Sequence, residues 1–184
     1  DVMSRLAVAR SPEGRGVLAG LARQEVQRII DSLAQSGLGR VGSLCLAANT
    51  AMTDIFLDRD VEGLCAAPYR LAHAGNETVA LPGLPPVYVP PLPAPFVGGD
   101  VSAGLAALLA GGTPRPFVLA DLGTNGEFLL ALAPETMLCA SVALGPALEG
   151  IGLPFTGVFH FIAPGIEVTC FTGSCGKFPF GLRG

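Results

Sequence analysis

The segment Phe117-Val-Leu-Ala-Asp-Leu-Gly-Thr-Asn-Gly-Glu127 joins an apolar strand pattern to a glycine-rich turn. Residues 117–122 predict a buried strand that carries the carboxylate of Asp121 near its end. The Asn-Gly pair that follows is the strongest short-range hairpin signal, so a second strand is expected over 128–132. A third strand is expected over 137–143. Because the connections are short, the three strands should be consecutive and antiparallel.

Outward from this hairpin, helical patterns alternate with short strands. Ser11-Pro12 has the residue types of a helix start, and apolar residues with helical spacing predict a helix over 12–36. The apolar run 41–48 predicts a buried strand on which this helix packs, and a short helix is expected over 51–57. A further helix over 101–110 ends at two glycines. Together these patterns predict an α/β fold with a mixed sheet and flanking helices.

The middle of the chain is rich in proline. Residues 60–96 hold eight of the sixteen prolines, so regular elements there must be short. Brief edge strands over 78–81 and 87–89 fit this composition, and we interpret the segment as a connector rather than a core. Two more strands are expected beyond the hairpin, over 158–162 and 166–171.

Composition excludes several classes of protein. Half of the 184 residues are hydrophobic and 14% are charged, and the net charge of −4 without a basic run disfavours a nucleic-acid partner. The longest apolar runs are far shorter than the roughly 20 residues that cross a bilayer, so no membrane partner is expected. Five irregularly spaced cysteines without a CxxC pair predict mostly buried, reduced thiols, a cytoplasmic location and no zinc site or iron–sulfur cluster in this chain.

The turn after Asp121 has the composition of an anion-binding loop. Glycines allow backbone N–H groups to approach a phosphate, and Thr124 and Asn125 add donors between Gly123 and Gly126. Asp121 is a candidate ligand for a hydrated magnesium ion beside that phosphate. An ordinary hairpin with a capping aspartate explains the same heptapeptide equally well.

Other candidate residues are weaker when taken one at a time. Gly145 and Pro146 follow the third strand at a strand–helix junction, where the backbone N–H groups of a helix start converge on one point, although a plain helix start with Pro146 at its first position explains them better. Asp100 is a candidate catalytic base that orients a water for attack on a phosphate, but spacing alone favours it as a helix N-cap. His73 and His160 are isolated and are interpreted as structural or exposed.

Several motifs in a fixed order do carry a resemblance. They are Asp1-Val-Met-Ser-Arg-Leu6, Asn49-Thr-Ala-Met-Thr53, Ala67-Pro68, Phe96-Val-Gly-Gly-Asp100, Asp121-Leu-Gly-Thr-Asn-Gly-Glu127, Gly145-Pro-Ala-Leu-Glu-Gly150 and Ala163-Pro-Gly165. The set resembles the C-terminal domain of the reductive activators of corrinoid proteins. That domain belongs to the ASKHA superfamily, which includes acetate and sugar kinases, Hsp70 and actin. The resemblance covers nearly all of residues 1–176.

The resemblance implies an actin-like ATPase fold made of two ribonuclease-H-like lobes. Residues 1–96 would hold the end of the first lobe with the proline-rich connector, and residues 97–184 the start of the second, so that the two-lobe domain is incomplete. Asp121 and the turn after it would be the phosphate loop for ATP and Mg²⁺. The implied activity is ATP-dependent reduction of a corrinoid protein's cobalt from Co(II) to Co(I). The resemblance also implies that the electron enters through an upstream [2Fe–2S] ferredoxin-like domain.

The chain also departs from the family pattern. A first Asp-x-Gly-Thr loop and the ferredoxin-like domain are not in the sequence, and Pro179 disfavours the helix that the family has near the adenine. A non-catalytic interaction module with this fold and a small-molecule kinase of the same superfamily therefore stay open beside the ATPase. The expected partner is a corrinoid protein, and a homodimer is left open.

Overall fold

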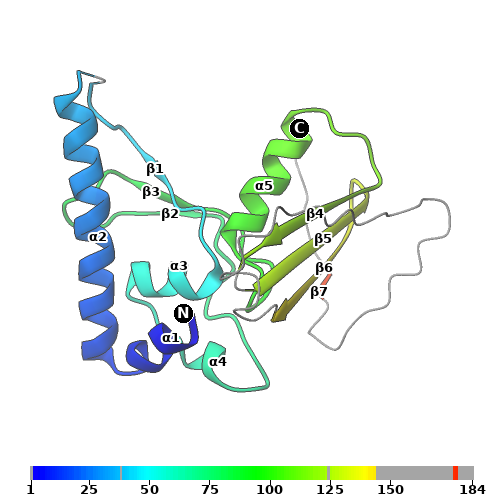
Figure 1. Ribbon diagram of the computed structural model, residues 1–184, viewed down its shortest axis with the longest axis horizontal. Helices are drawn as coiled ribbons and strands as arrows, with labels where there is room; N and C mark the ends of the chain where they lie inside the picture. The colour runs from blue at the N-terminus through cyan, green and yellow to red at the C-terminus, as the bar shows by residue number, and fades with distance from the viewer. Residues whose placement is uncertain (1, 38, 124, 144–175, 178–184) are drawn as a thin grey trace, which may run out of the picture.

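A computed structural model describes residues 2–37, 39–123, 125–143 and 176–177. The elements in chain order (Figure 1) are α1 (Val2–Ala9), α2 (Pro12–Gln35), β1 (Leu44–Cys45), α3 (Thr50–Leu57), α4 (Glu62–Cys65), β2 (Glu77–Val79), β3 (Val87–Val89), α5 (Gly99–Ala110), β4 (Phe117–Leu122), β5 (Asn125–Ala133), β6 (Thr136–Ala143) and β7 (Gly176–Lys177). The strands expected over 158–162 and 166–171, the turn at 145–150 and His160 lie outside the described residues.

Helix α2 begins as its sequence predicts. The Ser11 hydroxyl accepts a hydrogen bond from the Gly14 N–H at 3.0 Å, and Pro12 occupies the first helical position, where its missing N–H costs nothing. The helix packs against α1 and α3, and Figure 1 shows it along one side of the molecule. Its inner face also contributes Ala22 and Val26 to a cluster with the first sheet.

The first sheet has the strand order β1-β3-β2, with β1 parallel and β2 antiparallel to β3. Two expectations are corrected here. The strand predicted over 41–48 is only two residues long, and Cys45 is exposed, because only Leu44 and Cys45 pair with β3. The proline-rich segment is more than a connector, since β3 is central and buries Val87 and Val89 in the core.

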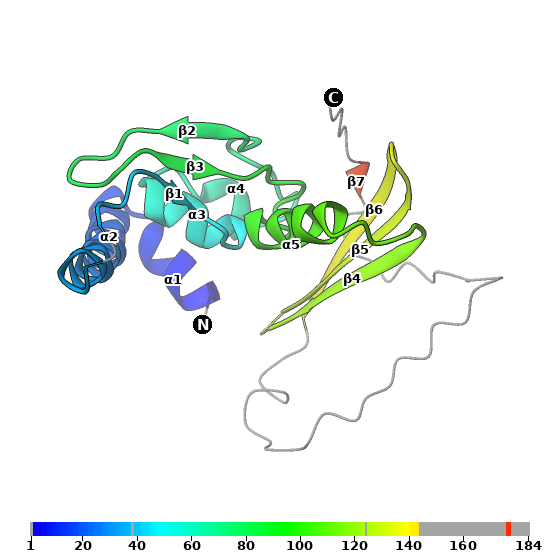
Figure 2. The ribbon, with the colours of Figure 1, turned by 90° about the horizontal axis from the view of Figure 1, so that it is seen from above.

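The second sheet confirms the hairpin prediction. Its order is β4-β5-β6-β7, and β4, β5 and β6 are consecutive and antiparallel. Helix α5 lies beside this sheet (Figure 2), with Val101 and Leu105 packed in one core with Leu129, Ala131 and other buried side chains. The Asn-Gly pair is not the centre of the turn, because β5 already begins at Asn125.

A close backbone contact joins the starts of α3 and α5. The Asp100 N–H donates to the Ala48 carbonyl at 3.2 Å, and the Thr50 hydroxyl donates to the Ala94 carbonyl at 3.0 Å. Gly98 makes the approach feasible, since a Cβ there would lie 2.5 Å from the Asn49 Cα. This contact brings polar residues from both halves of the chain to the end of the β4–β5 hairpin.

Two sequence expectations concern surfaces and thiols. Of the cysteines in the described part of the chain, Cys139 is buried, Cys65 is half-buried and Cys45 is exposed, so burial holds for only part of the set. Within the described ranges, no helix is both long enough and apolar enough to cross a bilayer.

Candidate functional site

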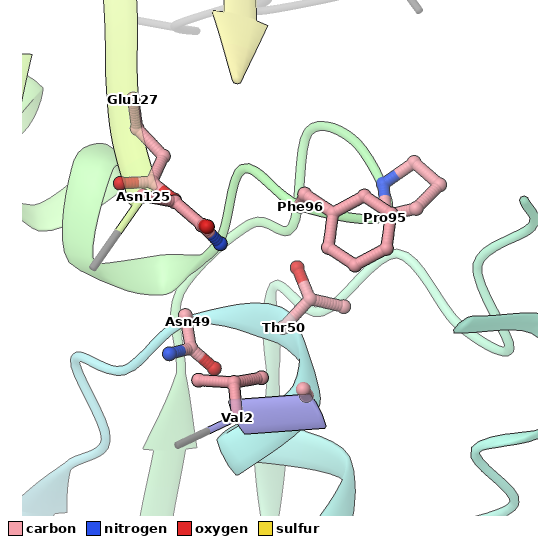
Figure 3. Close-up of a pocket in the computed structure, with 8 residues that line it drawn as sticks. Val2, Asn49, Thr50, Pro95, Phe96, Asn125 and Glu127 are labelled. Atoms are coloured by element: carbon pink, nitrogen blue, oxygen red, sulfur yellow. The ribbon is translucent and has the colours of Figure 1, made fainter. Parts of the chain in front are cut away.

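Three segments meet around a small cavity of about 10 Å³, which has room for roughly one water molecule. The start of α3 supplies Asn49 and Thr50, the turn before α5 supplies Phe96, and β5 supplies Asn125 and Glu127. Figure 3 shows the Asn125 amide pointing toward Asn49 and Thr50. The polar walls of the cavity therefore come from the start of α3 and from β5.

Asn49 has two roles at this point. As the N-cap of α3, its side-chain oxygen accepts a hydrogen bond from the Met52 N–H at 2.8 Å. In Figure 3 its side-chain amide points away from Asn125. Asn49 therefore both caps α3 and lines the cavity.

Glu127 is the acidic group that the sequence analysis did not single out. Its side chain lines the cavity and is only 7% exposed, and its Oε1 accepts a long hydrogen bond of 3.4 Å from the Ser141 hydroxyl. Burial, followed by the negative charges of Asp100 and Asp121, raises the pKa of Glu127 to about 7. One signal could have found it: in β5, Glu127 lies two residues from Asn125 and so on the same side of the strand.

Asp100 lies one residue inside α5, and Gly98 is the N-cap, so the N-cap interpretation of Asp100 is wrong. The Oδ1 atom of Asp100 accepts a hydrogen bond from the Val101 N–H at 2.8 Å. Burial raises the pKa of Asp100, and the charge of Asp121 raises it further. The electrostatic coupling places Asp100 near the other two carboxylates, and its role as a base stays a prediction.

Asp121 is exposed near the end of β4 and pairs with Glu127 in the β4–β5 ladder. Directly opposite residues of an antiparallel pair point to the same side of the sheet, so the two carboxylates are neighbours. The Gly123 N–H donates to the Asn125 carbonyl at 2.9 Å and thereby closes the turn. Gly126 is buried in the ladder, opposite Leu122.

Three residues predicted to bind phosphate lie outside the described residues. They are Thr124 in the turn after Asp121, and Gly145 and Pro146 after β6. The structure does gather Asp100, Asp121 and Asn125, and it adds Asn49, Thr50 and Glu127 to them. The cavity is much smaller than a nucleotide, so a nucleotide would lie outside it.

The predicted phosphate loop requires a site for Mg²⁺. Carboxylate and amide oxygens are the hard ligands that this ion prefers, and it usually keeps several waters. Within the described ranges, no three Asp, Glu, His or Cys side chains are placed to hold one ion together. The described residues therefore offer single carboxylates, of which Asp121 is exposed, rather than a complete set of metal ligands.

His73 is not isolated, contrary to expectation. Its Nε2 lies 2.8 Å from Asp54 Oδ1 and its Nδ1 lies 3.0 Å from Glu77 Oε1, while Arg59 forms two hydrogen bonds with Glu77. Asp54 is 1% exposed, and burial raises its pKa although the hydrogen bond from His73 opposes the effect. Through these contacts His73 links α3 to β2, which is in line with the predicted structural role for His73.

Comparison with known proteins defines the class of protein. The model of the family described as "RACo middle region" matches residues 1–109, which is more than half of the chain. The chain therefore belongs to the RACo middle region family. The match confirms the predicted resemblance to reductive activators of corrinoid proteins. The assignment to a C-terminal ASKHA domain stays a prediction.

Two individual relatives agree with this family. The chain is 35% identical over 113 residues to "Corrinoid activation enzyme RamQ" of Eubacterium limosum, covering 57% of this chain and 18% of that protein. A solved structure, "Reductive activator for corrinoid,iron-sulfur protein", superposes with a TM-score of 0.69 at 27% identity. That match covers 83% of this chain and 26% of the other. The chain thus spans only about a quarter or less of the length of these relatives.

Proposed function

We propose that the chain is the ATP-binding portion of an ATP-dependent reductive activator of corrinoid proteins, and that it supports reduction of Co(II) to Co(I). The observation that carries this proposal is the family match over residues 1–109, together with the names of the two relatives. The partner in this account is a corrinoid protein, and the electrons come from a [2Fe–2S] ferredoxin-like domain elsewhere in the activator.

The architecture is consistent with two ASKHA lobes that meet near residue 96. The strands β1–β3 and the strands β4–β7 form separate sheets, and each sheet has its own buried cluster. The contact at Gly98 then lies at the junction between the lobes. This division supports placing the nucleotide at that junction.

Within this account, each residue of the site has a defined task. A bound Mg²⁺ would neutralise phosphate charge, and Asp121 would hold the hydrated ion from its exposed position. Asp100 would orient the attacking water. Its carboxylate is suited to accept a proton from that water, because partial burial raises the pKa of Asp100. Thr124, with backbone N–H groups of the turn and of Gly145, would bind phosphate oxygens.

Two observations favour a second candidate, a non-catalytic interaction module. The Gly123 N–H is already used inside the hairpin, so it is not free to bind phosphate in this conformation. The cavity also has room for about one water rather than a nucleotide. In this alternative, the fold supports contacts with the corrinoid protein and binds no ATP.

Calorimetric titration of Mg-ATP into the natural full-length protein decides between the two. The wild type should bind, and Asp121→Ala should bind about tenfold to over a hundredfold more weakly, because one charge-assisted contact is lost. Glu135→Gln, in the exposed turn between β5 and β6, is the matched control and should bind like the wild type. Equal affinity of the wild type and Asp121→Ala removes the phosphate-loop assignment, and no binding by the wild type favours the interaction module.

A further inference from the structure

The imidazole ring of His73 lies between two carboxylates. Its Nε2 is 2.8 Å from Asp54 Oδ1, and its Nδ1 is 3.0 Å from Glu77 Oε1. A neutral imidazole has one N–H and one bare nitrogen, so it can donate to only one of two ionised carboxylates. The bare nitrogen would then face the lone pairs of a carboxylate oxygen. The geometry therefore requires one proton more than a neutral histidine and two ionised carboxylates contain.

Arg59 determines the state of the Glu77 side of the ring. Its guanidinium forms hydrogen bonds of 2.7 and 3.1 Å with the Glu77 carboxylate, and these bonds lower the pKa of Glu77. Glu77 is therefore ionised and accepts the Nδ1 proton of His73. The Gly75 N–H lies 3.3 Å from Nδ1, but it could donate there only if Nδ1 were bare and faced the ionised Glu77 at 3.0 Å.

The additional proton then belongs on the line between His73 Nε2 and Asp54 Oδ1. Asp54 is 1% exposed, and its Oδ2 has no hydrogen-bond partner among the described residues. Burial raises the pKa of Asp54, while the hydrogen bond from His73 and the charge of Arg59 lower it and the charge of Asp60 raises it slightly. Without the proton, the buried carboxylate would lose the one donor that the described residues give it, which is costly.

This contact fastens a short strand at the edge of the first sheet. Strand β2 has three residues, pairs with β3 alone among the described strands, and is the outermost strand of its sheet (Figure 2). Asp54 lies on α3, Glu77 is the first residue of β2, and His73 connects them. Because a short edge strand opens locally at a lower cost than a central strand, β2 is the element that this contact controls.

We propose that Asp54 and His73 share one proton that holds β2 against α3, and that loss of this proton as the pH rises releases β2. The inference goes beyond the proposed function, since none of these residues lines the cavity between α3 and β5. In the open state His73 is solvated, and an imidazole in water loses its proton near pH 6.5. Above that pH the closed state holds one proton more than the open state, so opening should rise up to tenfold per pH unit.

The test is hydrogen–deuterium exchange with mass spectrometry on the natural full-length protein at about pH 6 and about pH 8.5, corrected for the intrinsic pH dependence of exchange. Peptides over β2 should open about ten- to a hundredfold more at the higher pH in the wild type. Asp54→Asn should remove this dependence, because its amide donates to a bare Nε2 without an additional proton. His73→Gln should remove it as well, since its amide does not titrate. Asp60→Asn, the same change at an exposed neighbouring position, is the matched control and should keep it.

Three results overturn the proposal. The first is a wild type in which the corrected opening of β2 does not change with pH, or falls as the pH rises. The second is a pH dependence that survives in Asp54→Asn or, should that variant not fold, in His73→Gln. The third is its disappearance in Asp60→Asn, because the dependence then reflects surface charge rather than the proton between Asp54 and His73.

Discussion

The pH dependence of folding stability should change when Glu127 is replaced by glutamine. The pKa of this carboxyl rises from its ordinary value of 4.5 to about 7 in the folded protein. Because the folded pKa lies above the unfolded one, the proton is held more tightly in the folded state. The contribution of Glu127 to the free energy of unfolding is therefore fully present below pH 4.5 and is lost as the pH rises to about 7.

The interval between pKa 4.5 and about 7 corresponds to ~3 kcal/mol, since each pH unit is worth about 1.4 kcal/mol. Glutamine stays neutral at every pH and keeps a similar volume. Relative to the wild type, Glu127→Gln should therefore be nearly neutral at pH 4 and more stable by about 3 kcal/mol at pH 8.

Urea denaturation at several pH values between 4 and 8 measures this difference directly, in metal-free buffer at constant ionic strength. The quantity of interest is the mutant stability minus the wild-type stability, so that other titrating groups cancel. Glu135→Gln is the control, because its carboxylate is exposed and its difference should stay flat. A flat difference for Glu127→Gln, or one that falls with rising pH, would refute the electrostatic reasoning.

Two further predictions concern the framework around the site. Gly98→Ala should lower the free energy of unfolding by about 1–3 kcal/mol in chemical denaturation, since the new Cβ would lie 2.5 Å from the Asn49 Cα. Gly20→Ala, in the interior of α2 with no atom within 4 Å of the new methyl group, should instead add ~0.5–1 kcal/mol. His73→Leu should cost about 3 kcal/mol, because it leaves the buried carboxylate of Asp54 without its partner. Adding Asp54→Asn should recover part of that loss, and no recovery would contradict a role for the contact between His73 and Asp54.

Local patterns were sufficient for much of the fold. The N-cap and proline at Ser11-Pro12 and the apolar period predicted α2 to within one residue, and the apolar run at 117–122 matched β4. The prediction of a strand over 41–48 was wrong for a non-local reason. The length of β1 depends on pairing with β3, and only Leu44 and Cys45 pair with that strand. The burial of β3 likewise depends on α2 and α3, which the proline content of its own segment does not reveal.

The site could be predicted only in part for the same reason. Asp100 and Asp121 stand beside glycine-rich turns, so sequence alone singled them out. Glu127 lies in an ordinary strand pattern, and its burial depends on tertiary packing, since the cavity that it lines also includes residues from the start of α3 and from the turn before α5. His73 was interpreted as isolated although its partner Glu77 is four residues away; its other partner, the buried Asp54, is 19 residues away and lies on a helix.

The central claim is that the chain supports ATP-dependent reduction of a corrinoid protein. The most direct measurement follows the visible absorption of the corrinoid as Co(II) is converted to Co(I), with the natural full-length protein, a reductant, Mg²⁺ and ATP. The account predicts that reduction requires ATP in the wild type and is strongly slowed by Asp121→Ala, while Glu135→Gln behaves like the wild type. Reduction at the same rate without ATP, or an undiminished rate with Asp121→Ala, would contradict it.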